Sequence, residues 1–354
     1  MLLLDNDDVR RVLDVGSCLD ALENAYRAQA AGRALTRPRT QTRVPLAEPG
    51  LSYCLKTMEG AFLDGSYATL RLTSDIVSER PVSGVMRRDK LARGPGGTYC
   101  GLILVFSVER LEPVAILHDG YLQLFRVACT SALSARLLAR EEASTLGLLG
   151  TGGQAWAHLV AMNAVRPLTR VRVYSPNPEH RAIFAERAAR ELGLAVEPVA
   201  NAREAVAHAD LVVAATNTSE PIVDGSWIAP GAHVVSIVSG DLETQRRELD
   251  DEIFRRAALV IAHSKETARM QRHGDLSGPV SAGILRWDRI FDLSEVVAGR
   301  APRRGRSEDI TVFKNNVGLG LQFAAIAPRV YEAARAAGIG RELPAEWFLE
   351  DMKP

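Results

Sequence analysis

The chain has 354 residues, 47% of them apolar and 24% charged, and its 43 basic residues equal its 43 acidic ones. That length favours two domains, and the composition is typical of a globular protein rather than a disordered one. The balanced charge argues against nucleic-acid binding, and no apolar run reaches the roughly 18 residues that span a bilayer.

The N-terminus and the cysteines predict a cytoplasmic protein. Met-Leu-Leu-Leu runs at once into Asp5, without the basic segment and long apolar stretch of a signal peptide. The cysteines are far apart, with no CxxC pair and no nearby histidine at metal-ligand spacing: Cys18, Cys54, Cys100 and Cys129. We therefore expect buried thiols in a reducing compartment, no metal site and no membrane association.

The first third of the chain changes from a helical to a β pattern. Apolar residues recur at helical spacing over Val9–Arg33, which predicts one or two amphipathic helices. Turns rich in Gly and Pro then separate short β-type runs at Leu51–Leu55, Ala68–Thr73, Thr98–Phe106 and Val114–Leu117. These runs predict a mainly antiparallel sheet. The basic, glycine-rich segment Ser83–Gly97 is interpreted as a mobile loop near an anionic ligand or as the solvated tip of a hairpin.

The middle of the chain alternates strands and helices. After a helical pattern over Tyr121–Arg140, the predicted strands are nearly uniformly apolar: Thr145–Gly150, Arg170–Ser175, Val196–Val199, Leu211–Thr216, His233–Ser239 and Leu259–His263. Apolar strands that alternate with helices indicate a parallel sheet covered on both faces. A last strand at Asp309–Phe313 precedes a helix predicted over Val317–Ala337, which could return to the first domain.

The turn after the first of these strands carries a dinucleotide-binding signature. Gly150, Gly152 and Ala155 fit G-x-G-x-x-A, with Gly153 and Gln154 between them. The pattern ends an apolar strand, opens a helix and is followed by a second strand, and this context distinguishes it from a chance match. The first glycine permits a tight turn, the second lets the backbone approach a pyrophosphate, and the alanine allows close packing of helix on strand. The helix N-terminus adds unpaired N–H groups and a positive dipole end.

The end of the second strand predicts NADP as the cofactor, with NAD as the alternative. A carboxylate there would bind the ribose 2′-hydroxyl of NAD. This chain instead offers Ser175, Asn177 and, in the following helix, Arg181, which could bind a 2′-phosphate. Nearby Glu179 suits the first turn of that helix. The predicted cofactor contacts also include residues farther along the chain: Thr216, Asn217, Val238, Val317 and Gly318.

Several longer segments carry a family resemblance. They are PRTQTRVP (Pro38–Pro45), LFRVACTSALSARLLAR (Leu124–Arg140), LGLLGTGGQA at the glycine turn, EPIVDGSWIAPGAHVVSI (Glu220–Ile237), RRELDDEIF (Arg246–Phe254) and DITVFKNNVGLGL (Asp309–Leu321). In combination they resemble the ornithine cyclodeaminase/mu-crystallin family over nearly the whole chain. The resemblance implies a homodimer that moves a hydride between nicotinamide C4 and the α-carbon of an amino acid or its imine.

The fold class expected from these observations is α/β. A Rossmann dinucleotide-binding domain, residues 130–316, is inserted into a discontinuous α+β domain, residues 1–129 and 317–354, which the resemblance assigns to substrate binding and dimerisation.

The resemblance also implies roles for individual residues. The family's clamp for the substrate carboxylate falls on Arg126, its PRT arginine on Arg39, and its substrate-binding lysine on Arg71. The acid that handles the substrate amine falls on Asp241. All of these residues are expected to contact an amino-acid or imino-acid substrate.

The chain departs from the family pattern at two positions. The catalytic glutamate of the cyclodeaminases has no counterpart, because the aligned stretch holds Leu55 and Lys56. Lys56 is therefore a candidate proton donor or carbonyl polariser. In the last helix, where the family often has an acidic residue, this chain has Gln322.

Elementary chemistry also supports a ligand at Arg126. A guanidinium binds a carboxylate with two hydrogen bonds and keeps its charge. Arg126 lies in an otherwise apolar helix, where an unpaired charge is costly, so an anion should face it. The alternative is an internal ion pair with a protein carboxylate. For Arg39 the alternative is a solvated basic loop, and for Arg71 it is a cross-strand salt bridge.

We therefore predict NAD(P)H-dependent reduction of an imino acid, reversible as amino-acid oxidation, with Arg71, Lys56 and Asp241 as catalytic residues. Asp241 would orient or exchange the proton as C=N becomes C–N. One alternative is a cyclodeaminase that keeps NAD bound and releases ammonia, against which the missing glutamate counts. Another is a non-catalytic, dinucleotide-dependent ligand-binding protein of the crystallin type, against which the retained charges count.

Overall fold

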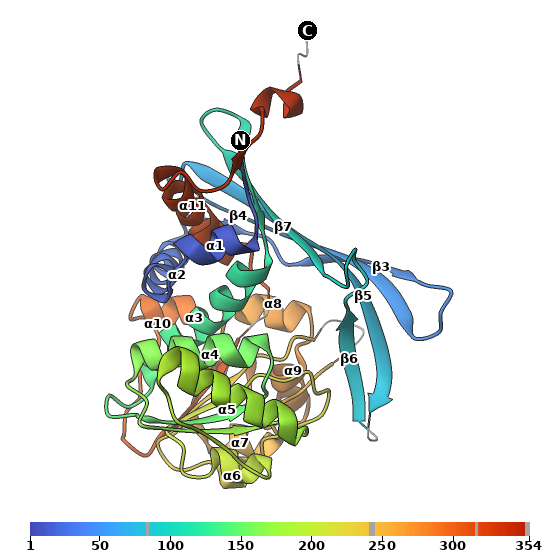
Figure 1. Ribbon diagram of the computed structural model, residues 1–354. Coiled ribbons are helices and arrows are strands. Elements are labelled where there is room, and N and C mark those ends of the chain that lie inside the picture. The colour runs from blue at the N-terminus through green and yellow to red at the C-terminus, as the bar shows by residue number, and fades with distance from the viewer. Residues whose placement is uncertain (83–84, 241–244, 316–317, 351–354) are drawn as a thin grey trace. The chain divides into compact units, whose positions relative to one another are not determined.

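The computed structural model describes residues 1–82, 85–240, 245–315 and 318–350. The chain divides into two compact units (Figure 1). The first contains Met1–Glu79, Asp89–Arg126 and Gly318–Pro354, and the second contains Arg80–Arg88 and Val127–Val317. Among the described residues, no helix is both long and apolar enough to cross a membrane.

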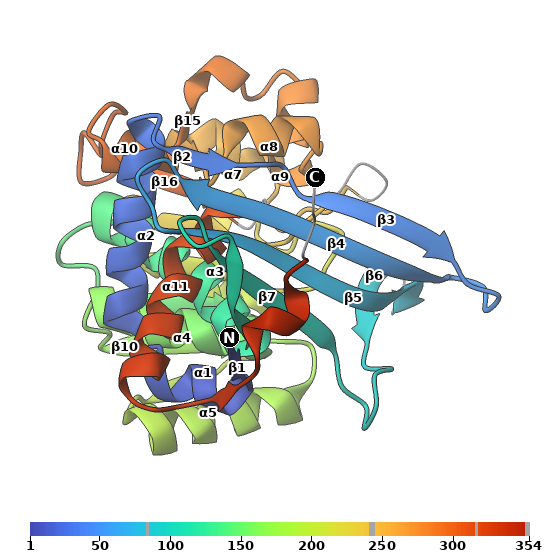
Figure 2. The ribbon, with the colours of Figure 1, turned by 90° about the horizontal axis from the view of Figure 1, so that it is seen from above.

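The first unit is built on a mainly antiparallel sheet, as predicted. Its strands follow the order β17-β1-β8-β7-β5-β4-β2, with β3 also paired to β4 and β6 to β5. Only the pairing of β1 with β8 is parallel among those with a described register. Figure 2 shows the long strands β3, β4 and β5 side by side. The bounds are β1 Leu2–Leu4, β2 Ala34–Thr36, β3 Thr40–Pro45, β4 Leu51–Phe62, β5 Tyr67–Val82, β6 Val85–Leu91, β7 Cys100–Ser107, β8 Glu112–His118 and β17 Arg341–Glu342.

Helices pack against this sheet and place the last part of the chain beside the first. They are α1 Asn6–Val12, α2 Val15–Ala30, α11 Leu321–Ala336 and the short η3 Ala345–Phe348, while α3 Gly120–Leu138 runs on into the second unit. Asp5 and Asp14 cap α1 and α2 by accepting bonds from first-turn N–H groups. Helix α11 packs on both α2 and β4. The C-terminal helix therefore belongs to the same unit as the N-terminal helices.

The helix predicted over Val317–Ala337 begins instead at Leu321. Gly320 lies so close to β4 that an added Cβ would be 1.7 Å from the Glu59 carbonyl oxygen. On the other side, a Cβ on Gly60 would be 2.5 Å from the backbone of Gly320. Two facing glycines thus let the start of α11 approach the strand, which fixes where the helix begins.

Two further local expectations differ from the structure. The segment Ser83–Gly97 is not one loop, because Val85–Leu91 forms strand β6 beside β5. A positive charge on that strand, Lys90, is matched by Asp75 of β5, with 2.9 Å between nitrogen and oxygen. The thiol of Cys100 is exposed at the start of β7, whereas the other three cysteines are buried, as expected.

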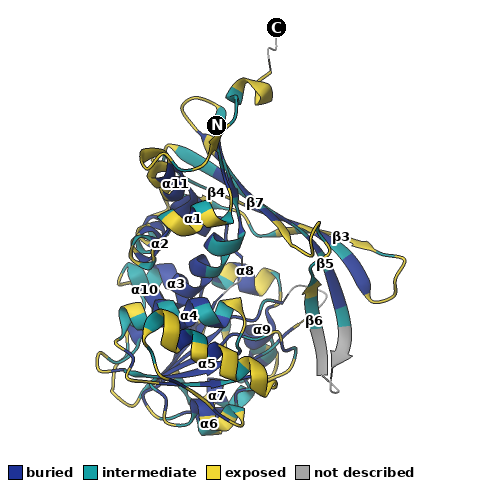
Figure 3. Cartoon of the chain, in the orientation of Figure 1, coloured by how far each residue is buried: buried dark blue, intermediate teal, exposed yellow. Residues whose placement is uncertain are grey.

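The second unit is a parallel sheet in the order β11-β10-β9-β12-β13-β16-β14-β15. The bounds are β9 Thr145–Leu149, β10 Arg170–Tyr174, β11 Val196–Pro198, β12 Leu211–Ala214, β13 His233–Ser236, β14 Ala257–Ala262, β15 Ile290–Asp292 and β16 Ile310–Lys314. The connecting helices are α4 Gly153–Val165, α5 Pro178–Leu192, α6 Ala202–Val206, α7 Asp251–Arg256, α8 Lys265–Met270, α9 Gly274–Ser281 and α10 Leu293–Val297, with the short η1 Gly225–Trp227 and η2 Trp287–Arg289. Figure 3 shows that buried residues fill these strands while the outward face of α5 is exposed.

The order of the strands fixes where a ligand can bind. From β9 the chain moves outward to β10 and β11, and then returns to place β12 on the other side of β9. The direction of winding therefore reverses between β9 and β12. In a sheet of this kind ligands bind outside the carboxyl ends of the strands at such a reversal. The predicted Rossmann fold is confirmed.

Candidate functional site

The glycine turn joins β9 to α4, as its motif predicts. Gly150 has a φ of +111°, and an added Cβ would lie 2.3 Å from the Ala215 carbonyl oxygen, so only glycine fits. Gly152 is the N-cap of α4, and a Cβ added there would meet nothing within 4 Å. Gly153 and Gln154 open the helix, and Ala155 is fully buried.

The start of α4 fits a dinucleotide. No described side chain caps this helix, so first-turn N–H groups are left for a ligand. A glycine with open space above it, beside an uncapped helix N-terminus, is what the pyrophosphate of a nicotinamide dinucleotide needs. Gly150, Gly152 and Gly153 are therefore the residues that would hold it.

The three residues predicted to bind a 2′-phosphate lie together at the end of β10. The hydroxyl of Ser175 accepts from Thr151 (3.2 Å), and Arg181 donates to the Ser175 carbonyl oxygen with its guanidinium over the Tyr174 ring. The side chain of Asn177 caps α5, accepting from the N–H groups of residues 179 and 180. The side-chain oxygen of Asn177 is therefore already hydrogen-bonded to the backbone of α5.

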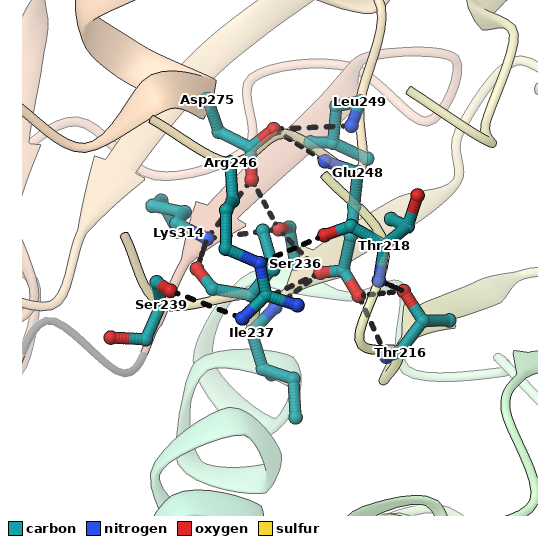
Figure 4. Close-up of polar contacts among 11 residues, drawn as sticks. Thr216, Thr218, Ser236, Ile237, Ser239, Arg246, Glu248, Leu249, Asp275 and Lys314 are labelled. Carbon is teal, nitrogen blue, oxygen red and sulfur yellow. Dashed lines mark hydrogen bonds and ion pairs between the residues drawn. The ribbon is translucent and has the colours of Figure 1, made fainter. Parts of the chain in front are cut away.

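A buried carboxylate binds the backbone just past the ends of β12 and β13 (Figure 4). Glu248 is fully buried, and its Oε1 accepts from the N–H and the hydroxyl of Thr216, both at 2.8 Å. Its Oε2 accepts from the N–H groups of Ile237 (2.9 Å) and Val238 (2.8 Å). Strands β12 and β13 end earlier than predicted, at Ala214 and Ser236, and the N–H groups of Thr216, Ile237 and Val238 beyond them bond to this carboxylate.

Two more buried charges complete this cluster. Asp275, the second residue of α9, accepts from the backbone N–H of Glu248 (2.9 Å) and from the ammonium of Lys314 (2.9 Å). Lys314, at the end of β16, also donates to the Val238 carbonyl oxygen (2.5 Å) and to the hydroxyl of Ser236 (3.0 Å). Asp275 is wholly buried.

The Ser236 hydroxyl lies between the two carboxyl groups of this cluster. The Ser236 hydroxyl contacts both Glu248 Oε2 (2.8 Å) and Asp275 Oδ2 (2.5 Å), yet it has only one hydrogen to donate. It can therefore donate to only one of the two carboxyl oxygens at a time. Burial raises the pKa of Glu248, and the nearby Lys314 ammonium offsets this rise only in part. The buried guanidinium of Arg246, which donates to the carbonyl oxygens of Thr218 and Ser239, is a second cation in this group of residues (Figure 4).

In the first unit, Arg126 on α3 is 2% exposed. Its Nε and Nη2 donate to Gln123 Oε1 (3.0 and 2.9 Å), and its Nη1 donates to Gln322 Oε1 (2.8 Å). These amide oxygens accept hydrogen bonds but neutralise no charge. Burial, and then the nearby Arg71, lower the pKa of Arg126 to about 9. The nearby Asp119 carboxylate acts in the opposite direction and raises this pKa.

Arg71 on β5 makes the ion pair that was its alternative interpretation. Its Nε and Nη2 donate to the two carboxylate oxygens of Asp119, at 3.1 and 2.5 Å. The ring of Phe323 lies under both guanidiniums, 5.3 Å from that of Arg71 and 5.4 Å from that of Arg126. The two arginines, 55 positions apart in the sequence, are therefore neighbours on one aromatic face.

The other predicted substrate residues of this unit divide between two places. Arg39 is half-buried and acts electrostatically on Arg126, so it belongs with Arg71 and Arg126. Gly318, with φ +82°, packs beside it, since an added Cβ would lie 3.5 Å from the Arg39 Cβ.

Lys56 lies in a separate ion cluster. Its ammonium is 3.3 Å from Asp75 Oδ2, and Lys90 binds the same carboxylate. Burial of Asp75 opposes its ionisation, but Lys90 and Lys56 outweigh it and lower its pKa.

The remaining predicted residues lie just beyond strand ends or outside the described residues. Asp241 and Val317 lie outside the described residues. Asn217 is exposed and Val238 is buried, both just beyond the ends of their strands.

A family model for the ornithine cyclodeaminase/mu-crystallin family matches residues 89–338. The chain belongs to this family. It is 32% identical over 247 residues to a Δ1-pyrroline-2-carboxylate reductase of Bacillus cereus, covering 70% of this chain and 74% of the relative. It is 25% identical over 344 residues to an alanine dehydrogenase of Archaeoglobus fulgidus, covering 97% and 98%.

A solved structure matches nearly the whole chain. The Δ1-pyrroline-2-carboxylate reductase of Thermococcus litoralis, in complex with NADH and L-proline, has a TM-score of 0.83 and 27% identity. The superposition covers 97% of this chain and 100% of that one. The resemblance read from the sequence segments is thus confirmed.

Sequence reasoning missed the partners of the charged residues. No role was assigned from the sequence to Asp119, Phe323, Glu248 or Lys314. A signal was present for Lys314, because a lysine that ends an apolar strand needs a buried partner. For Glu248 the only signal was a family-like segment.

Proposed function

We propose that this protein is a nicotinamide-dependent oxidoreductase that reduces the C=N bond of an α-imino acid and catalyses the reverse oxidation. The observation that carries this proposal is the buried Arg126 guanidinium, which bonds to amide oxygens and lies beside Arg71. A group of this kind is suited to a carboxylate. The relatives that reduce a cyclic imino acid and the bound NADH and L-proline of one of them support the same conclusion.

The residues of this chain would divide the work as follows. When bound, the dinucleotide supplies the hydride that adds to the imine carbon, and the glycine turn after β9 holds its pyrophosphate. Arg126, with Arg71 and Arg39, would hold and orient the substrate carboxylate, and their burial would exclude water. A proton must reach the nitrogen as the C=N bond becomes C–N. We propose Asp241 as its source, with Lys56 as the second candidate.

We further propose the division of labour expected from the sequence. Residues 1–129 and 317–354 would bind substrate and form a homodimer, and residues 130–316 would bind the dinucleotide. The arginines lie in the first compact unit and the glycine turn in the second, which supports this division. A cytoplasmic location remains part of the proposal.

The function is tested by a panel of imino acids, cyclic and linear, mixed with reduced dinucleotide. We expect net loss of the near-ultraviolet absorbance of the reduced nicotinamide and formation of the matching amino acid. Release of ammonia from a diamino acid without net change of the cofactor would show a cyclodeaminase instead. Binding of both ligands without either reaction would show a binding protein of the crystallin type.

We propose NADP rather than NAD as the physiological cofactor. The residues at the end of β10 include no carboxylate that would repel a 2′-phosphate, and Arg181 is anchored there by the Ser175 carbonyl and the Tyr174 ring. We expect NADPH to bind more tightly than NADH. Arg181→Ala should lower NADPH affinity by about 10- to 100-fold and leave NADH affinity unchanged, since a charged hydrogen bond is worth roughly 1.5–3 kcal/mol.

A matched control lies on the same helix. The guanidinium of Arg187 stacks 3.7 Å from the Trp156 ring, so Arg187→Ala should leave the ratio of the two affinities unchanged. Calorimetric titration of each variant with both dinucleotides measures this ratio. A wild type that prefers NADH would contradict the proposal, as would an Arg181→Ala variant that loses both equally.

A further inference from the structure

The reversal of the sheet divides a dinucleotide site into two halves. The pyrophosphate is expected at the turn after β9, and one mononucleotide then lies over the β9 and β10 side. The other lies over the side that β12 and β13 form. Since Ser175 and Arg181 lie at the end of β10, the residues just beyond β12 and β13 belong to the nicotinamide half. These are Thr216 and Val238.

A single side chain ties those two segments together. Glu248 receives the N–H and hydroxyl of Thr216 on one oxygen and the N–H of Val238 on the other. The Val238 carbonyl oxygen is held at the same time by Lys314. Both polar groups of the Val238 peptide unit are thus fixed by buried charged residues.

Glu248 is itself fixed in position. Its backbone N–H donates to Asp275, and its carbonyl oxygen accepts from the N–H groups of Ile222 (2.9 Å) and Val223 (3.0 Å). The side chain is fully buried, so water does not compete for its oxygens. Because both the backbone and the carboxylate of Glu248 are hydrogen-bonded, this residue can hold the segments after β12 and β13 at a fixed distance from each other.

We infer that Glu248 is a positioning residue for the nicotinamide half of the cofactor site. The inference rests on the proposed function. Glu248 acts through the backbone of Thr216 and Val238, which it holds at the spacing that the nicotinamide ring requires. Hydride transfer depends steeply on where that ring lies.

The inference predicts that glutamine cannot replace this glutamate. The two side chains are nearly equal in size, but both oxygens of Glu248 accept backbone N–H groups. An amide would turn its NH2 group, which only donates, toward either Thr216 or Val238. Glu248→Gln therefore releases one of the two loops while the other bonds can persist.

The test compares ligands that differ in the nicotinamide half. Titrations measure the affinity of wild type and Glu248→Gln for the dinucleotide that the wild type prefers, and for ADP-ribose with the same 2′-substituent. We expect ADP-ribose affinity to stay within about twofold, whereas dinucleotide affinity and kcat each fall about tenfold or more, the effect of one buried hydrogen bond left unmade.

Asp210 offers a matched control at the amino ends of the strands of the same sheet. Its carboxylate, just before β12, accepts from the N–H groups of Ser144 and Thr145 (both 3.0 Å) and from the Thr145 hydroxyl (2.7 Å), at the start of β9. Asp210→Asn should lower the melting temperature without changing the ratio of the two affinities. It separates lost stability from lost positioning.

Equal loss of both ligands in Glu248→Gln, or loss of neither, overturns the inference. A wild type that binds neither ligand overturns the proposed function instead. If the glutamine variant does not fold, Glu248→Asp serves in its place. Its carboxylate is one methylene shorter and cannot reach both loops, so the same selective loss is expected, and an equal loss of both ligands again contradicts the inference.

Discussion

Replacing Arg126 by alanine should lower kcat/KM for an imino acid by about 10²- to 10⁴-fold. Two charge-assisted hydrogen bonds to a carboxylate are worth roughly 1.5–3 kcal/mol each, and losing them also frees the substrate to leave its reactive orientation. Dinucleotide affinity should change little, because the glycine turn that would hold the pyrophosphate belongs to the other compact unit. Arg126→Lys should recover only part of the activity, since an ammonium cannot form a two-pronged contact.

A structural role for Arg126 predicts a different result. Removing it leaves the oxygens of Gln123 and Gln322 without their donor, which costs stability whatever the substrate. Melting temperature and steady-state kinetics should therefore be measured on the same preparation. A destabilised variant whose folded fraction keeps normal kinetics would mean that Arg126 supports the fold and that the substrate site lies elsewhere.

Arg166 supplies the control for this experiment. Its guanidinium donates to backbone carbonyl oxygens near the end of α3, among them those of Arg136 (3.2 Å) and Arg140 (3.1 Å). Arg166→Ala should lower the melting temperature by several degrees and leave kcat/KM unchanged. The two variants together distinguish a ligand-binding arginine from one that satisfies the ends of a helix.

Gly152→Val should weaken dinucleotide binding by at least about two orders of magnitude while the protein stays folded. A Cβ at this position meets nothing in the protein, so the valine side chain would occupy the space that the pyrophosphate needs. The substitution places valine at a helix N-cap, which costs only about 1 kcal/mol and a few degrees of melting temperature. Fluorescence titration with reduced dinucleotide gives the affinity.

The neighbouring glycine provides the contrasting variant. Gly150 has a positive φ, and a Cβ there would collide with the Ala215 carbonyl oxygen. Gly150→Ala should therefore destabilise the second unit, and any loss of binding should follow the loss of folded protein. Unchanged affinity in a folded Gly152→Val would refute the assignment of this turn to the cofactor.

Local patterns in the sequence were sufficient for much of this protein. The turn at Gly150–Ala155 and the alternation of strands and helices depend on residues close together in the chain, so their spacing predicts the Rossmann unit. The apolar surroundings of Arg126 likewise indicate a buried cation within one helix. The family segments were also present in the sequence, and the family model confirms the family that they indicate.

The predicted strand ends differ from the structure beside a side chain that is distant in the sequence and bonds to the backbone there. Strands β12 and β13 were predicted to run to Thr216 and Ser239, since the apolar pattern continues that far. They end at Ala214 and Ser236, and Glu248, 32 positions beyond Thr216, accepts N–H groups just past both ends. Strand β6 was not predicted because its segment is basic, which is typical of a loop. In the structure one of these charges, Lys90, binds Asp75, which lies 15 positions earlier in the sequence.

The sequence by itself determined the fold class, the glycine turn and the kinds of charged side chain that a substrate carboxylate needs. Only the tertiary structure decided which of those charges meet. Arg71 reaches Asp119 across 48 positions, and Arg126 reaches Gln322 across 196. Hydrogen bonds and ion pairs act over a few ångströms in space, and a single sequence holds no direct record of separations in space, so a candidate residue could be named from its type but its partner could not.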